Sequence, residues 1–345
     1  MTFVRRLRLA VLVVLAAGVS SGCVSSILAR KIVAPPNRSG IVPLFADSPV
    51  VKRGPDAYAQ TWKLARPSPP ATISIATVEP GDYAFRYDLD VRFPPGKDAV
   101  IRHLEASWRP AAERVRPTTP PRGTIVLLHG YLLDRRYVVP WAITFAQAGY
   151  RCALVDLRGH GESTGRHIGF GAFEAADVGA VIDSLRDRGW DVSRVGLFGV
   201  SYGASVAMLA AGRDPRVRAV VALEPFASAE RAVPELMRTV FAGEARGISD
   251  AQFALAHVKE AKIAGFDWRD ADVPAALART TAPVLFVHGA ADRWIPAEHS
   301  RQLVKVAPRG SELEIRPEDD HVTLPLQVPA LRDRVLRWFE PLSSP

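Results

Sequence analysis

One stretch, residues 195–208, constrains the fold more than any other part of this 345-residue chain. It opens with four apolar residues, which are typical of a buried strand. Gly199-Val200-Ser201-Tyr202-Gly203 follows directly, and small apolar residues and helix formers continue to residue 211. A strand, a tight turn and a helix in immediate succession leave the central side chain standing out at the end of a sheet. We therefore expect Ser201 to be a nucleophile. The amide of Tyr202, at the helix N-terminus, should face a developing negative charge.

The same five-residue pattern occurs a second time, at residues 161–165 around Ser163. Glycines at 165, 169 and 171 interrupt the segment after it, so no helix can start directly behind this serine. We expect Ser163 to be a loop hydroxyl that bonds to the nearby backbone.

Apolar strand patterns alternate with helical patterns over most of the chain. Such alternation predicts right-handed strand–helix–strand units. Continuous apolar strands also favour a parallel sheet that is covered on both faces. The fold class is therefore α/β, with a doubly wound, mostly parallel sheet. Strands are expected at 124–129, 152–157, 195–198, 217–223, 283–288 and 312–316, and helices at 137–148, 173–188, 204–211, 297–306 and 328–338.

The alternation stops between residues 226 and 280. Helical patterns at 229–241 and 251–264 follow one another there with no strand pattern between them. A connection of this length is far longer than an ordinary loop, so it predicts a helical cap inserted into an α/β domain that covers residues 81–345.

The N-terminus has the pattern of a secretory signal. Arg5, Arg6 and Arg8 precede an apolar segment at residues 9–19, which is too short to span a bilayer. Small residues then lead to Cys23, in a pattern that resembles the lipobox of bacterial lipoproteins, although Ser20 stands where an aliphatic residue is usual. We expect a signal peptide over residues 1–22 and acylation of Cys23. The protein would then be extracytoplasmic, anchored in a membrane of the cell envelope. An uncleaved anchor and plain secretion remain open.

Residues 23–80 are rich in proline and have little sustained periodicity. We expect a lipid-anchored tether that continues as a partly extended segment, with one short helix at residues 58–64. Alternation of period two at 82–93 predicts a strand, and residues 101–108 are a second strand candidate.

Composition narrows the possible partners. The chain carries a net charge of +8, but no basic run with interleaved aromatic residues marks a nucleic-acid groove, so no nucleic-acid partner is expected. A mild attraction to anionic membrane lipid fits the charge better. The two cysteines and the histidines show no metal-ligand spacing, so we expect no metal, and Cys152 lies in an apolar run typical of a buried thiol.

Reactive side chains follow several of the expected strands. Since ligands bind at the carboxyl ends of such strands, Ser201, Asp292 and His321 should meet there. A serine needs a base to take its proton, and an imidazole needs a carboxylate to fix its tautomer. Their chain order is serine, acid, histidine. The amides of Tyr131 and Tyr202 would hold the oxyanion.

The combination of these motifs resembles the α/β-hydrolase superfamily. The resemblance covers roughly residues 80–340 and rests on five motifs: His129-Gly130-Tyr131, the loop 156–163, Gly199–Gly203, the segment from His288 to Asp292, and His321. It implies hydrolysis through an acyl-serine intermediate, without a cofactor. Asp320 departs from the family, which often has glycine before the histidine.

Other polar residues near these motifs have competing interpretations. Glu224, at the end of a strand, is the alternative acid. Asp292 itself could instead cap a helix. His129 and His160 are expected to shape loops, and His288 to pack beneath the site. His299 is expected on a helix surface, Asp319 and Asp320 as solvated loop charges, and Trp294 and Phe226 either in an acyl pocket or in the core.

These residues favour cleavage of a carboxylic ester, with a small or lipid-like ester as substrate. Cleavage of amides or thioesters by the same triad, and acyl transfer to an acceptor other than water, remain open. So does a non-catalytic envelope protein that binds a lipid or a partner. The sequence alone does not identify the substrate.

Overall fold

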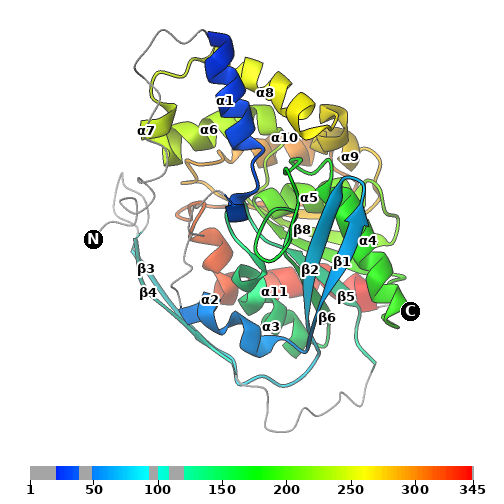
Figure 1. Cartoon of the computed structure of the whole chain (residues 1–345). Helices are drawn as coiled ribbons and strands as arrows, with labels where there is room; N and C mark the ends of the chain where they lie inside the picture. Colours follow the sequence, from blue (N-terminus) through cyan, green and yellow to red (C-terminus); the bar gives the residue numbers. More distant parts are fainter. Residues whose placement is uncertain (1–20, 39–48, 93–99, 109–119, 344–345) are drawn as a thin grey trace.

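The computed structural model describes residues 21–38, 49–92, 100–108 and 120–343. The expected signal peptide therefore lies outside the described residues up to residue 20. An eight-stranded sheet forms the centre of the molecule, with strand order β1-β2-β6-β5-β7-β8-β9-β10 (Figure 1). Its strands are β1 Gln60–Pro67, β2 Pro70–Val78, β5 Thr124–Leu128, β6 Arg151–Val155, β7 Val195–Val200, β8 Val217–Leu223, β9 Val284–Gly289 and β10 Glu312–Arg316.

The six strands from β5 to β10 pair in parallel, which confirms the predicted mostly parallel sheet. Alternate residues of each strand enter two separate cores. In β5, Val126 and Leu128 pack with helices α4 and α5, whereas Ile125 and Leu127 pack with α3 and α11 on the other face. The sheet is thus buried on both sides, as its apolar strands require. These helices are α3 Val139–Gln147, α4 Glu174–Asp187, α5 Tyr202–Ala211 and α11 Val328–Phe339, while α10 Glu298–Val306 joins the α5 side.

The prediction for residues 58–64 is wrong. No helix forms there, and from Gln60 the chain forms the edge strand β1, which pairs with β2 as an antiparallel hairpin. β2 in turn pairs antiparallel with β6. Trp62 and Leu64 lie on the half-buried side of β1, alternating with exposed neighbours, which is the pattern of an edge strand. The second half of the segment expected to be a tether, residues 60–78, therefore belongs to the central sheet.

The two strands expected before residue 109 are present but do not join the central sheet. β3 Arg86–Arg92 and β4 Val100–Ser107 pair with each other in a separate two-stranded antiparallel sheet. In β3 the half-buried residues alternate with exposed ones, which explains the period-two pattern in the sequence.

The insertion between β8 and β9 is helical, as predicted. It contains α6 Ala229–Val240, α7 Ala242–Ala245, α8 Asp250–Ala264 and α9 Val273–Leu277. The N-terminal helix α1, Ser21–Ile32, packs against α8 of this cap (Figure 1). The short helix α2 covers Pro49–Arg53. Within the described part of the chain, no helix is long and apolar enough to cross a membrane.

Lys259 ties α1 to the cap. Its Nζ donates to the carbonyl oxygen of Gly22 at 2.6 Å and to the hydroxyls of Ser25 and Ser26 at 3.1 and 2.8 Å. Residues expected to form a loose tether thus begin as a helix fixed to the body of the protein.

Candidate active site

The turn at Ser201 is sharp because two glycines allow close backbone contacts. A Cβ atom at Gly199 would lie 2.4 Å from the carbonyl oxygen of Gly203, and one at Gly203 would lie 2.4 Å from that of Leu128. Ser201 itself has φ 51° and ψ −113°, a conformation that non-glycine residues rarely adopt. The turn places Ser201 between the end of β7 and the start of α5, as the sequence predicted.

The structure brings Ser201, His321 and Asp292 into one hydrogen-bonded row. The Oγ of Ser201 lies 2.9 Å from Nε2 of His321, and the Nδ1 of His321 lies 2.6 Å from Oδ2 of Asp292. The three residues follow β7, β10 and β9 and meet at the carboxyl ends of these parallel strands. If Nδ1 carries the proton and donates it to Asp292, then Nε2 is left as an acceptor for the serine hydroxyl.

Asp292 is buried and held ionised by its partners. Its Oδ1 accepts hydrogen bonds from the amides of Trp294 and Ile295 at 2.8 and 2.9 Å. Burial alone would raise the pKa of this carboxyl, but the charges and hydrogen bonds of His321 and His288 outweigh it and lower the pKa to about 2. The carboxylate of Asp292 therefore caps its own turn and pairs with His321 at the same time.

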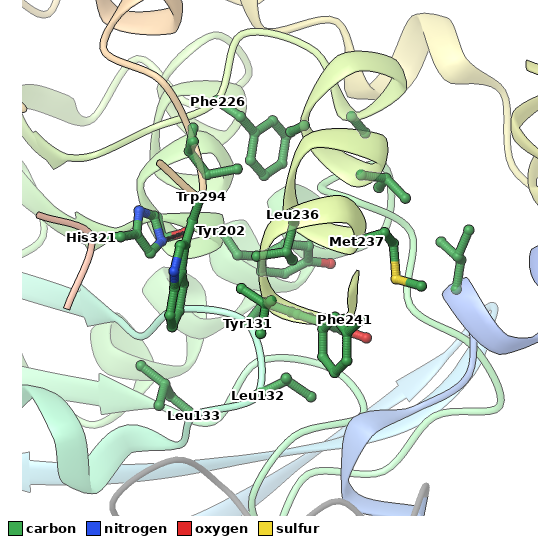
Figure 2. A pocket seen from close by; sticks show the side chains of 18 of the residues that line it. Tyr131, Leu132, Leu133, Tyr202, Phe226, Leu236, Met237, Phe241, Trp294 and His321 are labelled. Carbon is green, nitrogen blue, oxygen red and sulfur yellow. Dashed lines mark hydrogen bonds between the residues drawn. The ribbon is translucent and has the colours of Figure 1, made fainter. Parts of the chain in front are cut away.

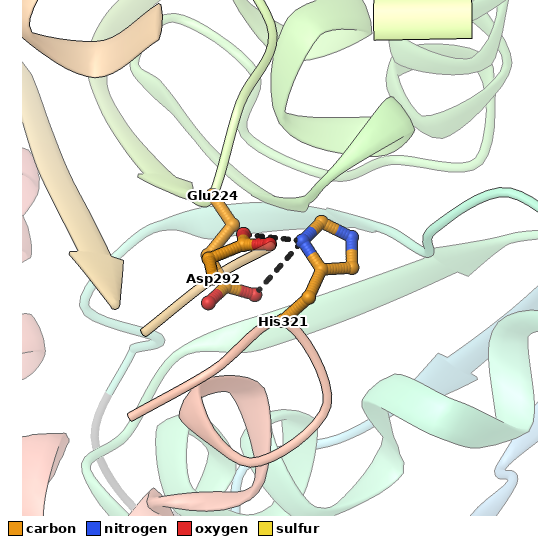
Figure 3. Close-up of side chains that lie close together, drawn as sticks. All are labelled: Glu224, Asp292 and His321. Carbon is orange, nitrogen blue, oxygen red and sulfur yellow. Dashed lines mark hydrogen bonds and ion pairs between the residues drawn. The ribbon is translucent and has the colours of Figure 1, made fainter. Parts of the chain in front are cut away.

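Glu224, the alternative acid, lies beside this row (Figure 3). Its Oε2 is 3.6 Å from Nδ1 of His321, which is longer than a hydrogen bond. The side chain is fully buried at the end of β8, at a residue with φ 53°, and neither carboxyl oxygen has a hydrogen-bond partner among the described residues. Burial, and then the charge of Asp292, raises the pKa of Glu224 well above its ordinary value, which favours the protonated form of this carboxyl.

Glu224, Asp292 and His321 each have a ligand-type atom within 4.8 Å of the others, a spacing that a metal ion could use. However, Asp292 and His321 are joined directly at 2.6 Å, which is a hydrogen bond with no room for an ion between the two atoms. We therefore interpret the group as a hydrogen-bonded acid–histidine pair with a second buried carboxyl beside it.

The backbone that should complete the oxyanion site lies against Ser201. A Cβ atom on Gly130 would lie 3.6 Å from the Cβ of Ser201, so the Gly130–Tyr131 segment passes directly beside Ser201. Tyr202 is the first residue of α5, where amides have no carbonyl partner within the helix. Both amides predicted to bind the oxyanion therefore belong to segments that adjoin Ser201.

A buried ion pair supports this segment. Asp156, at the end of β6, accepts from the Arg135 amide at 2.8 Å and from its Nη1 at 2.6 Å, and also from the amide of Glu162 at 2.9 Å. The loop after β5 is thereby tied to the loop after β6, which the sequence analysis singled out without a role. Removing one partner would leave a buried charge unpaired, which is strongly destabilising.

An apolar cavity of about 370 Å³ opens beside Ser201 and His321 (Figure 2). Phe226 and Trp294, for which a pocket and a core position were both expected, line this cavity. Side chains of α6, including Leu236 and Met237, form another wall. Leu28 and Ile32 of α1 also line the cavity, a contribution that was not predicted from the sequence. Their spacing of four residues is that of one helix face, a signal present in the sequence.

Comparisons with known proteins agree with this fold. A model of the family described as serine aminopeptidase S33 matches residues 119–261. The Pyrococcus furiosus esterase Pf2001 superimposes with a TM-score of 0.58 at 17% identity, over 85% of this chain and 95% of the esterase. The chain therefore has the fold of the α/β hydrolases.

Curated relatives of this α/β hydrolase are distant. The uncharacterized protein YqkD of Bacillus subtilis is 26% identical over 209 residues, which cover 60% of this chain and 67% of YqkD. The monoacylglycerol lipase of Mycolicibacterium smegmatis is 29% identical over 229 residues, covering 58% of this chain and 81% of the lipase. Two further relatives are aligned over only 38% and 39% of their length.

Several side chains of this α/β hydrolase have the structural roles expected of them. The Oγ of Ser163 donates to the carbonyl oxygen of Asp156 at 2.6 Å, so it bonds to local backbone. Nε2 of His129 accepts from the Leu157 amide, which leaves Nδ1 to donate to Gly130. His288 packs beneath the site, where its ring nitrogens contact Ser300 and Ile295.

Two minor predictions are wrong. His299 is fully buried rather than on a helix surface, because Nδ1 accepts from the Ala227 amide and Nε2 lies 2.8 Å from Glu235 of the cap. Asp319 is buried and not a solvated charge, since it bonds to Arg316 and Gln327. The partners of His299 are 72 and 64 residues away in the sequence, so local polarity did not indicate its burial, whereas the partners of Asp319 are only three and eight residues away.

Cys23 and Cys152 lie in different environments. Cys23 is exposed on α1, whereas Cys152 is buried in β6, and no disulfide joins them. Burial raises the pKa of the Cys152 thiol well above its ordinary value, as expected of an inert core cysteine.

Proposed function

We propose that this α/β hydrolase is a serine esterase that cleaves carboxylic esters with an apolar acyl group. The observation that carries the proposal is the hydrogen-bonded row of Ser201, His321 and Asp292 at the edge of an apolar cavity. The row supplies a nucleophile, a base and a fixed carboxylate, and the cavity supplies space for an acyl chain.

In the proposed reaction, Nε2 of His321 takes the proton of Ser201 while Oγ attacks the ester carbonyl carbon. The amides of Tyr202 and Tyr131 bind the resulting oxyanion, and Asp292 stabilises the imidazolium. His321 then donates its proton to the departing alcohol, which leaves an acyl group on Ser201. A water molecule, deprotonated by His321, attacks that acyl group and releases the carboxylic acid.

The lining of the cavity favours an ester over a peptide. Its wall is built mainly from aliphatic and aromatic side chains, which match a hydrocarbon chain and offer few partners to a peptide backbone. The names of the similar monoacylglycerol lipase and esterase point the same way.

The proposal includes a place in the cell envelope. The basic N-terminus, the apolar segment 9–19 and the small residues before Cys23 support secretion followed by acylation. The exposed position of Cys23 on α1 is compatible with an attached lipid. Intact mass measurement of the membrane fraction should find a chain that begins at Cys23 and carries acyl groups. A Cys23→Ser chain that fractionates with the membrane as before, and differs in mass only by the substitution, would contradict acylation at Cys23.

The activity is tested by covalent labelling and an ester panel. A fluorophosphonate probe should label the full chain, and Ser201→Ala should abolish both labelling and ester hydrolysis. p-Nitrophenyl esters of increasing acyl length are compared with matched thioesters and aminoacyl anilides. Faster cleavage of anilides or thioesters would favour the other reaction classes, and a folded chain inert to every substrate and probe would favour a binding protein.

A further inference from the structure

We propose that the outer surface of α1 and α8 docks on a lipid bilayer and so delivers membrane lipid esters to the cavity. This inference rests on the proposed esterase function and names where its substrate comes from. We define the α1–α8 surface by three exposed residues, Ile27 of α1 and Leu255 and Val258 of α8.

The exposed apolar side chains are concentrated on these two helices. Of the four large apolar side chains found strongly exposed in the described part of the chain, three belong to the α1–α8 surface. The fourth, Val306, lies on α10. Leu255 and Val258 are three residues apart, so they share one face of α8, and they are 39% and 53% exposed. The opposite face buries Phe253, Ala256 and Glu260, so the exposed apolar pair is not part of the face of α8 that packs on the protein.

The position of the chain before α1 indicates a bilayer as the occupant. The apolar segment 9–19 precedes α1, and Cys23 lies in the first turn of that helix. Whether Cys23 is acylated or the apolar segment stays as an uncleaved anchor, the start of α1 would lie at the bilayer surface. Lys259 bonds to Ser25 and Ser26, which remain in a chain that begins at Cys23, so α1 and α8 approach the bilayer together.

Charge near the surface fits anionic lipid headgroups. Arg30 and Lys31 are exposed in the last turn of α1, and Lys262 is exposed one turn after Val258. Apolar side chains with flanking basic residues are the composition of helices that lie in a membrane interface.

The same helix also forms a wall of the cavity. Leu28 and Ile32 line the cavity while Ile27, next in sequence to Leu28, is exposed. At 1.5 Å per residue, Leu28 and Ile32 lie only about 8 and 14 Å along the helix from Cys23. Exposed Lys31 also lines the cavity, so the cavity reaches the surface beside α1. A lipid leaving the bilayer at this helix would thus have a short path to Ser201.

The test uses the full chain reconstituted in vesicles of phosphatidylethanolamine with phosphatidylglycerol as the minor component. p-Nitrophenyl butyrate is supplied in solution and p-nitrophenyl palmitate within the bilayer. The wild type should hydrolyse both. The double substitution Leu255→Ser with Val258→Ser should lower palmitate hydrolysis about tenfold and leave butyrate hydrolysis within about twofold, because interfacial binding scales with the apolar area that enters the membrane. Val306→Ser, the matched control, should change neither rate.

Each other outcome has a distinct meaning. Butyrate hydrolysis by the wild type with no palmitate hydrolysis overturns the inference and leaves the esterase proposal intact, whereas failure on both substrates overturns the esterase proposal. An unchanged palmitate rate in the double variant, or an equal loss on both substrates, also overturns the inference. So does a detergent-solubilised dimer that the double variant converts to monomer in sedimentation, since the surface would then bind a second copy of the chain.

Discussion

At the scale of single residues, the two carboxylate oxygens of Asp292 have different partners. Oδ1 caps the turn after β9, and Oδ2 orients His321. Asp292→Asn should therefore keep the turn but present an amide to Nδ1, which stabilises the wrong tautomer of the imidazole. We expect kcat to fall about 10³–10⁴-fold with little change in KM. Steady-state kinetics on a soluble p-nitrophenyl ester measures this, and near-normal activity of the variant would show that Asp292 is not the orienting acid.

The protonation of Glu224 should affect the stability of the protein more than its reaction rate. Its pKa is raised in the folded protein, so between the unfolded pKa and the folded pKa the folded state holds a proton that the unfolded state has released. The contribution of Glu224 to the free energy of unfolding must therefore fall as pH rises above about 4.5, by at most about 1.4 kcal/mol per pH unit.

Glu224→Gln removes this proton linkage while keeping the shape of the neutral side chain. We expect the free energy of unfolding of the variant to fall less than that of the wild type as the pH rises from about 5 to about 8, a range that lies above the ordinary pKa of a glutamate. Urea unfolding at several pH values measures the difference. Activity at neutral pH should stay within about threefold of the wild type, since Glu224 lies 3.6 Å from Nδ1 of His321 and the amide that replaces it has the same size. Parallel pH profiles of stability would show that folding does not raise the pKa of Glu224.

At the scale of secondary-structure elements, most strands and helices from residue 124 onward were predictable, because the buried strands are short continuous apolar runs and the helices repeat their apolar positions. β8 and β10 begin and end where the sequence predicted. The segment 60–78 was harder to predict because its hairpin carries Pro67, Pro69 and Pro70, which are typical of a loop. In the structure Pro67 pairs with Pro70, so the prolines mark the turn between two strands.

The order of the strands could not be predicted in full. Local alternation predicted that β3 is extended, but pairing depends on surfaces elsewhere in the chain. β1 and β2 extend the central sheet through β6, whereas β3 and β4 pair only with each other.

α1 should depend on Lys259 for its attachment. Lys259→Ala removes the donor to the first turn of the helix, and the hydroxyls of Ser25 and Ser26 lose that partner. We expect amide hydrogen exchange in residues 24–32 to accelerate by about tenfold, with little change in β5 or β7. Lys262→Ala, an exposed lysine on the same helix, is the control and should leave the exchange unchanged. Equal protection in both variants would mean that apolar packing alone holds α1.

At the scale of the whole molecule, the meeting of Ser201, Asp292 and His321 was easier to predict than the cavity around them. Ser201, Asp292 and His321 each occupy a short motif at the end of a strand, so their meeting follows from the fold class. The cavity walls come from α1, from the loop after β5 and from α6, which are far apart in the chain. No local sequence pattern indicates that these segments pack against one another.

The cavity should set the preferred acyl length. Met237 lies on the side of the cavity away from His321 (Figure 2). Met237→Trp fills that side, so we expect hydrolysis of long-chain p-nitrophenyl esters to fall about tenfold while the acetate ester is cleaved within about twofold of the wild-type rate. Glu230→Trp adds the same ring to the exposed side of α6 and is the control. A uniform loss over all chain lengths would place Met237 in the fold rather than in acyl selection.

The docking of α1 on α8 also has a consequence for biosynthesis. Lys259 and its partner Ser25 are 234 residues apart, so α1 leaves the ribosome long before its partner in α8 exists. Until then the face of α1 that packs on α8 is uncovered, and such exposed surface is prone to aggregation. A polypeptide that stops before residue 250 could assemble the strands up to β8, yet it would have neither the partner of α1 nor the acid and histidine that follow.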